Sequence, residues 1–215
     1  MWEKGRIIDD VALVDRFFEG GLSLHFTSQI TNVYCGVASM TVVFNALGLP
    51  FEERPQSPLM KPGGFRYFDQ NNVFNGCMRD VMHEAGIYQS PWGITLRQLK
   101  EYFGCRTGSD YRGGDDFKGG AKELSRVLAR EMSTPGHFLV ANYHRKAIGQ
   151  TGGGHHSPLG AYSPSKDMVL IMDVARLVSS VWGMVSGGGW RVGGAARLAS
   201  SVWVLGSGFG LRVEG

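Results

Sequence analysis

The spacing of apolar residues predicts two kinds of element, and helices dominate the first half of the chain. Between residues 35 and 47 apolar side chains recur every three or four positions among further apolar residues, which predicts a helix buried on most sides. Asn32 is a candidate N-cap for this helix, and Gly48 is a stop signal after it. Residues 121–132 have the narrower apolar face of an amphipathic helix.

Three shorter segments carry weaker helical patterns: 9–18, 77–86 and 95–103. Thr95 is placed to cap the third of them. Residues 51–76, rich in Pro, Gly and Asn, are typical of a long surface excursion. A long loop inside a compact domain is often functional.

The second half of the chain changes to extended patterns. Residues 136–144, 155–162 and 167–175 are typical of strands, and the last two are joined by Ser-Pro-Ser-Lys, which has the composition of a turn. Helices first and strands later predict an α+β domain whose C-terminal part holds an antiparallel sheet. Residues 177–215 are rich in glycine and lack a clear period, so the pattern predicts no element there.

Composition excludes several classes of protein. The net charge of +3 is not gathered into Lys/Arg runs, so it gives little support to nucleic-acid binding. The chain contains no apolar run long enough to span a membrane. Its N-terminus carries acids within the apolar stretch, unlike a signal peptide, and we therefore expect a cytoplasmic protein.

The three cysteines also limit the interpretation. An odd number without a Cys-x-x-Cys pair argues against a disulfide framework and against a zinc knuckle, and it fits a reducing compartment. We therefore expect Cys77 and Cys105 to be buried thiols. Cys35 differs from them because it lies at the start of the predicted buried helix.

The predicted hairpin brings a histidine toward a carboxylate. With the turn centred on Pro164 and Ser165, His155 lies opposite Asp173 on the same face of the sheet. A carboxylate at the end of an apolar strand is costly without a partner, and an imidazole N–H supplies one. A register slip of one residue would place His156 there instead, so this geometry favours His155 only modestly.

Cys35 completes a candidate catalytic arrangement. A thiol in the first turn of a helix has a lowered pKa, and beside an imidazole it would form the nucleophile–base–orienter series of a cysteine enzyme. Gln29 and the backbone N–H of Cys35 are candidate oxyanion donors. The alternative is that Cys35 is a small core residue. The adjacent histidines do not predict a metal site, because neighbours on a strand point to opposite faces.

Three segments together resemble the phytochelatin synthase family of papain-like γ-glutamylcysteine dipeptidyltransferases. They read TSQITNVYCGVASMTVVFNALG, FRYFDQNN and VANYHRKAIGQTGGGHHSPLGAYSPSKDMVLIMDVAR, and the resemblance covers about residues 15–176. It is similar to the short bacterial type that has the catalytic domain only. The resemblance implies one catalytic domain over residues 1–215 with a papain-like fold, the nucleophile helix in its N-terminal part and the sheet in its C-terminal part. Residues 177–215 are atypical: the family's Pro-Pro-x-Trp segment and a later arginine have no clear counterpart there.

The resemblance also assigns residues. The family's catalytic positions fall on the nucleophile Cys35, the oxyanion glutamine Gln29, the base His155 and its partner Asp173. The family's Gly-His-apolar-Ser-Pro segment places His156 at an apolar position. The same resemblance implies that Gly154 borders the acyl pocket and that Arg176, which closes the Asp-Val-Ala-Arg segment, contacts substrate.

The implied activity is glutathione γ-glutamylcysteinyltransferase. Cys35 would attack the Cys–Gly bond of glutathione, release glycine, and pass the γ-Glu-Cys acyl group to a second glutathione or to water. The first outcome is phytochelatin synthesis, a heavy-metal detoxification reaction. Metals such as cadmium and zinc would enter as thiolate complexes of the substrate, with no tightly bound cofactor and no metal site in the protein. The family also implies a homodimer.

Three alternatives are open at this point. The chain could be a glutathione hydrolase that yields γ-Glu-Cys only. It could be an inactive member that binds thiol peptides or metal, with a disrupted C-terminus. A general papain-type peptidase is the third alternative.

Overall fold

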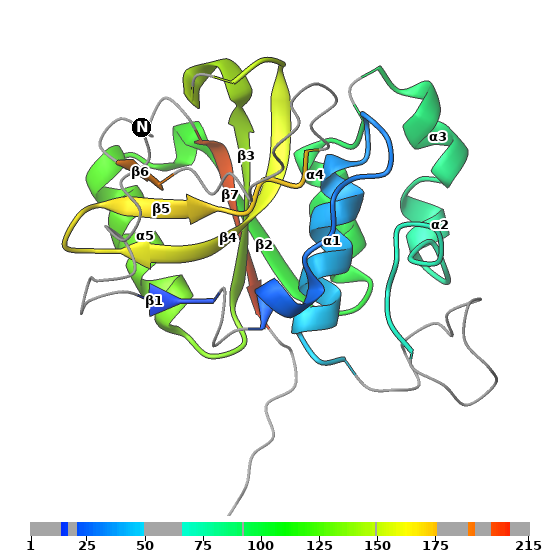
Figure 1. Ribbon diagram of the computed structural model, residues 1–215, viewed down its shortest axis with the longest axis horizontal. Helices are drawn as coiled ribbons and strands as arrows, with labels where there is room; N and C mark the ends of the chain where they lie inside the picture. The colour runs from blue at the N-terminus through cyan, green and yellow to red at the C-terminus, as the bar shows by residue number, and fades with distance from the viewer. Residues whose placement is uncertain are drawn as a thin grey trace, which may run out of the picture.

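The chain combines one antiparallel sheet with a group of helices beside it (Figure 1). The computed structural model describes residues 14–16, 21–49, 66–91, 93–148, 150–175, 189–191 and 199–206. In Figure 1 the helices α1 to α4 gather at one side of the sheet, whereas α5 lies beside the strands at the other. This arrangement of helix and antiparallel sheet agrees with the predicted α+β class.

Among the described residues, five helices have the following bounds: α1 Cys35–Ala46, α2 Met78–Val81, α3 Glu84–Gln89, α4 Leu96–Gly104 and α5 Ala121–Ser133. Short 3₁₀ turns occupy Leu22–His25, Gly114–Asp116 and Arg145–Ile148. The predicted helices at 35–47, 95–103 and 121–132 are confirmed. The segment predicted as one helix at 77–86 contains two short ones.

In the part of the chain that the structure describes, seven strands form the sheet: β1 Val14–Asp15, β2 Gly108–Gly113, β3 Phe138–His144, β4 Gly154–Ser163, β5 Met168–Ile171, β6 Gly189–Arg191 and β7 Ala199–Gly206. Their order is β2-β7-β3-β4-β5-β6, and β1 pairs with β4 beside this path. The two long central strands β3 and β4 pair directly. The late strand β7 inserts between β2 and β3, so a segment without a clear sequence period forms part of the sheet's interior.

Helix α1 is buried along ten of its twelve residues, because apolar and small side chains surround its whole circumference. Its N-cap is Tyr34, without a side-chain capping bond, so the predicted cap at Asn32 is wrong. The Tyr34 hydroxyl instead donates to Oε1 of Glu84 at 3.0 Å and ties the start of α1 to α3. The helix stops before Gly48, whose φ of +63° suits a residue without Cβ.

Helix α4 begins as the sequence predicts. The Thr95 hydroxyl accepts the backbone N–H of Gln98 at 3.3 Å, and the Gln98 side chain accepts the Thr95 N–H at 2.8 Å. This reciprocal capping box satisfies two backbone donors that a helix start leaves unpaired.

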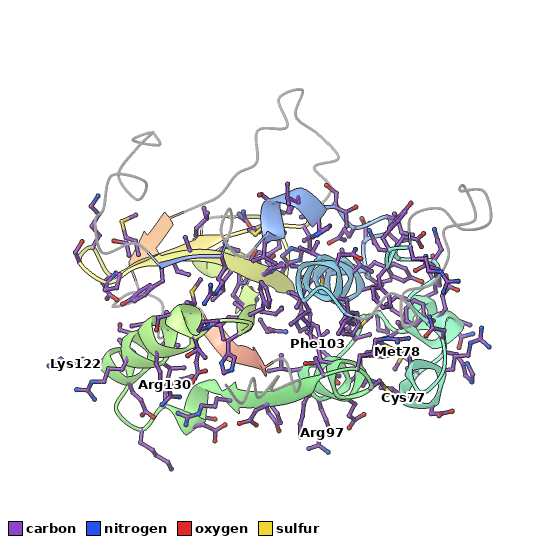
Figure 2. The ribbon with its side chains drawn as sticks, turned by 90° about the horizontal axis from the view of Figure 1, so that it is seen from below. Cys77, Met78, Arg97, Phe103, Lys122 and Arg130 are labelled. Atoms are coloured by element: carbon purple, nitrogen blue, oxygen red, sulfur yellow. A yellow bond between two sulfur atoms is a disulfide. The ribbon has the colours of Figure 1, made fainter. Side chains whose placement is uncertain are left out.

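Among the described residues, a small apolar cluster surrounds Cys35, and two larger ones flank the sheet. The larger surrounds α1 and α4 and includes Phe44, Leu99 and Phe103. The smaller lies between α5 and the strands and includes Leu128 and Tyr162. Figure 2 shows Lys122 and Arg130 extending away from α5, on the side opposite its apolar face. The structure thus places α1 against β4, and this contact determines the candidate site.

Strand β1 replaces a predicted helix, and strand β2 lies in a segment for which the sequence pattern predicted no strand. Val14 and Asp15 form β1 rather than part of a helix, and the rest of the predicted helix at 9–18 lies outside the described residues except for Arg16. Residues 111–113, within a glycine-rich stretch, extend β2 and pair with β7. The local sequence pattern predicts neither β1 nor β2, because each strand depends on a partner far away in the sequence.

The β4–β5 hairpin has a different register from the predicted one. Tyr162 pairs with Val169, whereas a turn centred on Pro164 and Ser165 would pair it with Lys166. The turn is longer than expected, and β4 has an irregularity between Leu159 and Ala161. The predicted register, which paired His155 with Asp173 across the hairpin, is therefore wrong.

Cys77 and Cys105 form a disulfide, with Cα atoms 5.9 Å apart. The prediction of two buried thiols is wrong, and Cys77 is exposed at the start of α2 (Figure 2). The pair links α2 to the end of α4. The bond also removes the argument for a reducing compartment that the cysteine count had supplied.

No helix in the part of the chain that the structure describes is long and apolar enough to cross a membrane.

Candidate active site

The Cys35 thiol lies at the first residue of α1 and is 8% exposed. It packs against Ala38 and Val174, so the helix start faces the chain just beyond β5. Its side chain hydrogen-bonds His155, and the backbone N–H groups of His156 and Gly36 also reach it. The thiol is thus buried and surrounded by hydrogen-bond donors.

His155 follows Gly154 in β4, where it lies opposite Tyr143 of β3. Its Nε2 is 2.8 Å from Oδ1 of Asp173. Both side chains are only 6% exposed. Since Nε2 bonds the carboxylate, Nδ1 is the ring nitrogen left for Cys35. The structure therefore joins a thiol, an imidazole and a carboxylate in series.

Asp173 reaches His155 although the two are not cross-strand partners. Strand β5 ends at Ile171, and the backbone N–H of Ala175 donates to Oδ1 of Asp173 at 2.8 Å. Arg145 lies 3.4 Å from the same oxygen, and Nε2 of Gln150 donates to Oδ2 at 3.0 Å. The 145–150 segment before β4 thus holds the carboxylate from its other side.

Arg145 and Gln150 are not among the site residues predicted from the sequence. Their signal was available in the polar run HRKAIGQ between the two central strands. A buried carboxylate needs several donors, and a polar loop next to the base is a natural source of them.

The electrostatics of this series favour a charged pair. Burial alone raises the pKa of the Cys35 thiol, but the hydrogen bond and charge of His155 outweigh burial and hold that pKa below its ordinary value. Burial alone lowers the pKa of His155, but Asp173 and Cys35 raise it above its ordinary value. Burial likewise works against the charge of Asp173, yet the His155 bond leads a set of donors that lowers its pKa to about 2. Thiolate and imidazolium therefore stabilise one another.

His156 points away from this pair, as neighbours on a strand must. It is 3% exposed, and its Nε2 lies 3.2 Å from the carbonyl of Ile94. Complete burial leads the causes that lower its pKa to about 4, so it is neutral at physiological pH. His156 is therefore a structural residue between the sheet and α4.

The backbone of Gln29 is connected to the surroundings of the Cys35 thiol by a hydrogen bond to Val174. Its N–H donates to the carbonyl of Val174 at 2.8 Å, and Val174 packs against Cys35. Its Nε2 donates to the carbonyl of Thr31 at 2.6 Å, which leaves the second amide hydrogen available. Within the described residues, Oε1 of Gln29 is buried without a hydrogen-bond partner.

The two residues assigned to substrate contact have different outcomes. Gly154 opens β4 next to the base and is exposed. Arg176 lies outside the described residues. Among the described residues, no group of three His, Cys, Asp or Glu side chains could hold a metal ion.

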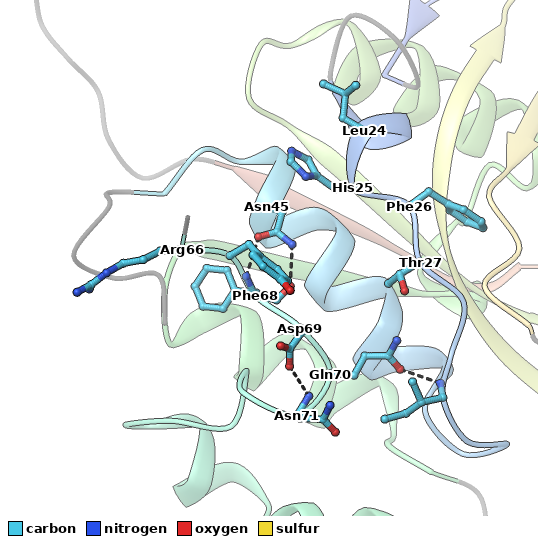
Figure 3. Close-up of a pocket in the computed structure, with 12 residues that line it drawn as sticks. Leu24, His25, Phe26, Thr27, Asn45, Arg66, Phe68, Asp69, Gln70 and Asn71 are labelled. Carbon is cyan, nitrogen blue, oxygen red and sulfur yellow. Dashed lines mark hydrogen bonds between the residues drawn. The ribbon is translucent and has the colours of Figure 1, made fainter. Parts of the chain in front are cut away.

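A pocket of about 690 Å³ is lined in part by residues that precede and follow Gln29 in the sequence (Figure 3). It is lined by Leu24, His25, Phe26, Thr27, Ile30, Asn45, Arg66, Tyr67, Phe68, Asp69, Gln70 and Asn71. Cys35, His155 and Asp173 do not line it. Phe26 both lines this pocket and packs against the small apolar cluster that contains Cys35.

The series of thiol, imidazole and carboxylate is the arrangement that thiol-dependent acyl-transfer enzymes use. The family model described as phytochelatin synthase matches residues 10–185. The chain belongs to the phytochelatin synthase family.

Relatives with curated descriptions agree with this assignment. The chain is 33% identical over 178 residues to glutathione gamma-glutamylcysteinyltransferase 1 of Triticum aestivum, covering 80% of this chain and 32% of that protein. It is 29% identical over 175 residues to the Arabidopsis thaliana protein of the same name, covering 80% of this chain and 33% of that one. For the Schizosaccharomyces pombe protein named glutathione gamma-glutamylcysteinyltransferase the identity is 27% over 158 residues, covering 72% and 34%. The chain matches about a third of the length of these relatives.

Proposed function

We propose that this protein is a glutathione γ-glutamylcysteinyltransferase that uses Cys35 as its nucleophile. The observation that carries the proposal is the contact series from Cys35 through His155 to Asp173. The names of the relatives support glutathione as the donor of the acyl group.

In the first half of the reaction, the thiolate of Cys35 attacks the carbonyl carbon of the Cys–Gly amide. The carbonyl oxygen becomes an oxyanion, which the second amide hydrogen of Gln29 and the backbone N–H of Cys35 would stabilise. The C–N bond then breaks, and protonated His155 gives its proton to the departing amine of glycine. A γ-Glu-Cys thioester on Cys35 remains.

In the second half, the amine of another glutathione attacks the thioester while His155 takes its proton. The C–S bond breaks and the thiolate of Cys35 is restored, with a peptide longer by one γ-Glu-Cys unit as product. Asp173 holds the imidazole in orientation through both halves. Water in place of the amine gives free γ-Glu-Cys, which is the hydrolase alternative.

Heavy metals such as cadmium and zinc would take part as thiolate complexes of the substrate. Soft cations prefer thiolate ligands, and glutathione supplies a thiol on each molecule. We propose no resident metal or cofactor. The exposed backbone at Gly154, next to the base, is the proposed edge of the acyl pocket.

We propose a papain-like fold as one catalytic domain over residues 1–215. The start of a buried helix carries the thiol and packs on a strand that carries the imidazole, which supports this proposal. A homodimer and a cytoplasmic location are further proposals, and light scattering of the purified protein tests the dimer.

The test is incubation of the protein with glutathione and cadmium, with free glycine and γ-Glu-Cys oligomers measured in parallel. We expect both products, and neither from Cys35→Ala. Glycine without oligomers would support the hydrolase. Folded protein that releases no glycine would contradict the proposal and favour an inactive binding member, while cleavage of an ordinary peptide but not of glutathione would indicate a general peptidase.

A further inference from the structure

We propose that Gln70 is a positioning residue that holds the oxyanion glutamine Gln29 in place relative to Cys35. The inference rests on the proposed function, since it concerns the same reaction. Gln70 lies 41 positions after Gln29 in the sequence. It is not part of the contact series described above.

The side-chain amide of Gln70 bonds the backbone on both sides of Gln29. Its Nε2 donates to the carbonyl of Ser28 at 2.8 Å, and its Oε1 accepts the N–H of Ile30 at 3.0 Å. Figure 3 draws the second of these bonds as a dashed line from Gln70. Gln70 is only 4% exposed, so these bonds are shielded from water. Both peptide groups that flank Gln29 are therefore fixed by one side chain.

The loop that carries Gln70 is itself tied to the nucleophile helix by the same kind of contact. Asn45 of α1 donates from Nδ2 to the carbonyl of Phe68 at 2.8 Å and accepts the N–H of Phe68 at 2.8 Å. The Phe68 ring packs 5.2 Å from the ring of Phe44. In Figure 3 the side chain of Asn45 reaches the loop that carries Phe68, and the side chain of Gln70 reaches the segment that carries Gln29. A continuous hydrogen-bonded path thus runs from α1 to the residues around Gln29.

This path matters because the side chain of Gln29 has few other restraints. The side-chain amide of Gln29 bonds the carbonyl of Thr31. Thr31 is only two residues away and belongs to the same segment, so this bond does not fix the segment relative to the rest of the protein. The backbone bond to Val174 fixes one point of the segment. A single point leaves the segment free to pivot, and the two bonds of Gln70 remove that freedom.

Two chemical probes separate this role from general support of the fold. Acylation of Cys35 by p-nitrophenyl acetate passes through a tetrahedral oxyanion, as the thiolate attacks the acetyl carbon and p-nitrophenolate leaves. Alkylation by iodoacetamide is a displacement at a saturated carbon, with iodide leaving, and forms no oxyanion. Both reactions need the thiolate, so their ratio reports the oxyanion site alone.

The test variants are Gln70→Met, which removes both bonds at similar volume, and Gln29→Ala. Misplacement of a catalytic group by about 1 Å can cost about a hundredfold, so we expect Gln70→Met to slow acylation at least about tenfold. We expect alkylation within about twofold of the parent protein, because the thiolate does not depend on Gln29. Asn71→Ala, at an exposed neighbouring position, is the matched control and should change neither rate.

A double variant tests whether Gln70 acts through Gln29. If it does, adding Gln70→Met to Gln29→Ala slows acylation by less than about twofold. Multiplied losses, or acylation and alkylation that fall together, would overturn the proposal. If Gln70→Met does not fold, Gln70→Glu keeps the acceptor for Ile30 and loses the amide donor to Ser28, and the same ratio is expected to fall less steeply.

The acetyl ester also separates this proposal from the substrate assignment. A protein that acylates Cys35 with the ester but releases no glycine from glutathione contradicts the proposed substrate and leaves the Gln70 prediction to be decided by the rates. Ester acylation of the parent protein no faster than of Cys35→Ala would overturn both.

Discussion

Replacing the Asp173 carboxylate by an amide should lower the fraction of Cys35 that is present as thiolate. Asp173→Asn keeps the shape of the side chain but removes its charge. The variant loses the charge-assisted bond to Nε2 of His155, which is 2.8 Å long and buried. The imidazolium is then less stable, and the thiolate that depends on it becomes rarer.

The size of this effect follows from the titration of Asp173. Its pKa moves from the ordinary value of 3.8 to about 2, which corresponds to about 2 kcal/mol favouring the ionised state. That net figure combines the bond to His155, the N–H of Ala175 and the charge of Arg145 with the opposing cost of burial, so about 2 kcal/mol sets the scale of the effect rather than a limit for the bond to His155. A hydrogen bond to a charged group contributes about 1.5–3 kcal/mol, which is the same range. We therefore expect a fall in the thiolate population of about tenfold to thirtyfold.

The assay is the rate of iodoacetamide alkylation of Cys35 as a function of pH. We expect the Asp173→Asn profile to move about 1–1.5 pH units upward, with about a tenfold to thirtyfold lower rate at neutral pH. Glu131→Gln is the matched control, because Glu131 is also a buried carboxylate, 2.9 Å from His137, but belongs to α5. It should leave the profile in place. An Asp173→Asn profile that coincides with the parent would refute the reasoning.

The same carboxylate makes stability depend on pH. The pKa of Asp173 in the folded protein lies below its value in the unfolded chain, so its contribution is complete above about pH 4 and is lost as the pH falls toward 2. Urea unfolding at several pH values should show that this part of the acid sensitivity disappears in Asp173→Asn. An unchanged slope would contradict the low pKa.

Two further changes test how the site is supported. Gly36→Ala should lower the free energy of unfolding by about 1–3 kcal/mol, because a Cβ there would lie 2.3 Å from Cδ1 of Ile94. Thermal unfolding measures this loss. The control is Gly153→Ala, where no heavy atom lies within 4 Å of an added Cβ. Equal melting temperatures of the two variants would contradict the close approach of Gly36 to Ile94. Cys77→Ser breaks the disulfide to Cys105 and should cost about 2–4 kcal/mol of stability while Cys35 alkylation stays unchanged. A fall in the alkylation rate of Cys35 in this variant would contradict the expectation and show that the disulfide supports the reactivity of Cys35.

The helices near the site could be predicted because their determinants are local. The apolar run after Cys35 and the Thr95 cap each act within a few residues of their own position. Strands β1, β2 and β7 could not be predicted in the same way. Each exists because a distant strand offers hydrogen bonds, and a pattern within one segment carries no information about that partner.

The candidate site illustrates the same limit. His155 and Asp173 were expected to meet as cross-strand partners, yet β5 ends before Asp173 and the side chains meet beyond the ladder. The expected pairing rested on a register that a longer turn and an irregularity near Gly160 displaced. The need of the buried carboxylate for a donor was the sounder argument, because it does not depend on the register.

The disulfide was missed for a further reason. An odd number of cysteines without a motif was taken as evidence for free thiols, but one pair and one free thiol also give three. Counting could not tell these cases apart. The distance between α2 and the end of α4 decides the matter, and only the tertiary structure contains it.

The most direct test of the account is mass spectrometry of the whole protein after brief exposure to glutathione, followed by peptide mapping. We predict a mass gain of one γ-Glu-Cys unit on Cys35, resistant to reductant and absent from both Cys35→Ala and His155→Ala. Folded protein that carries no such unit on Cys35, or only a whole glutathione that reductant removes, would contradict the central claim.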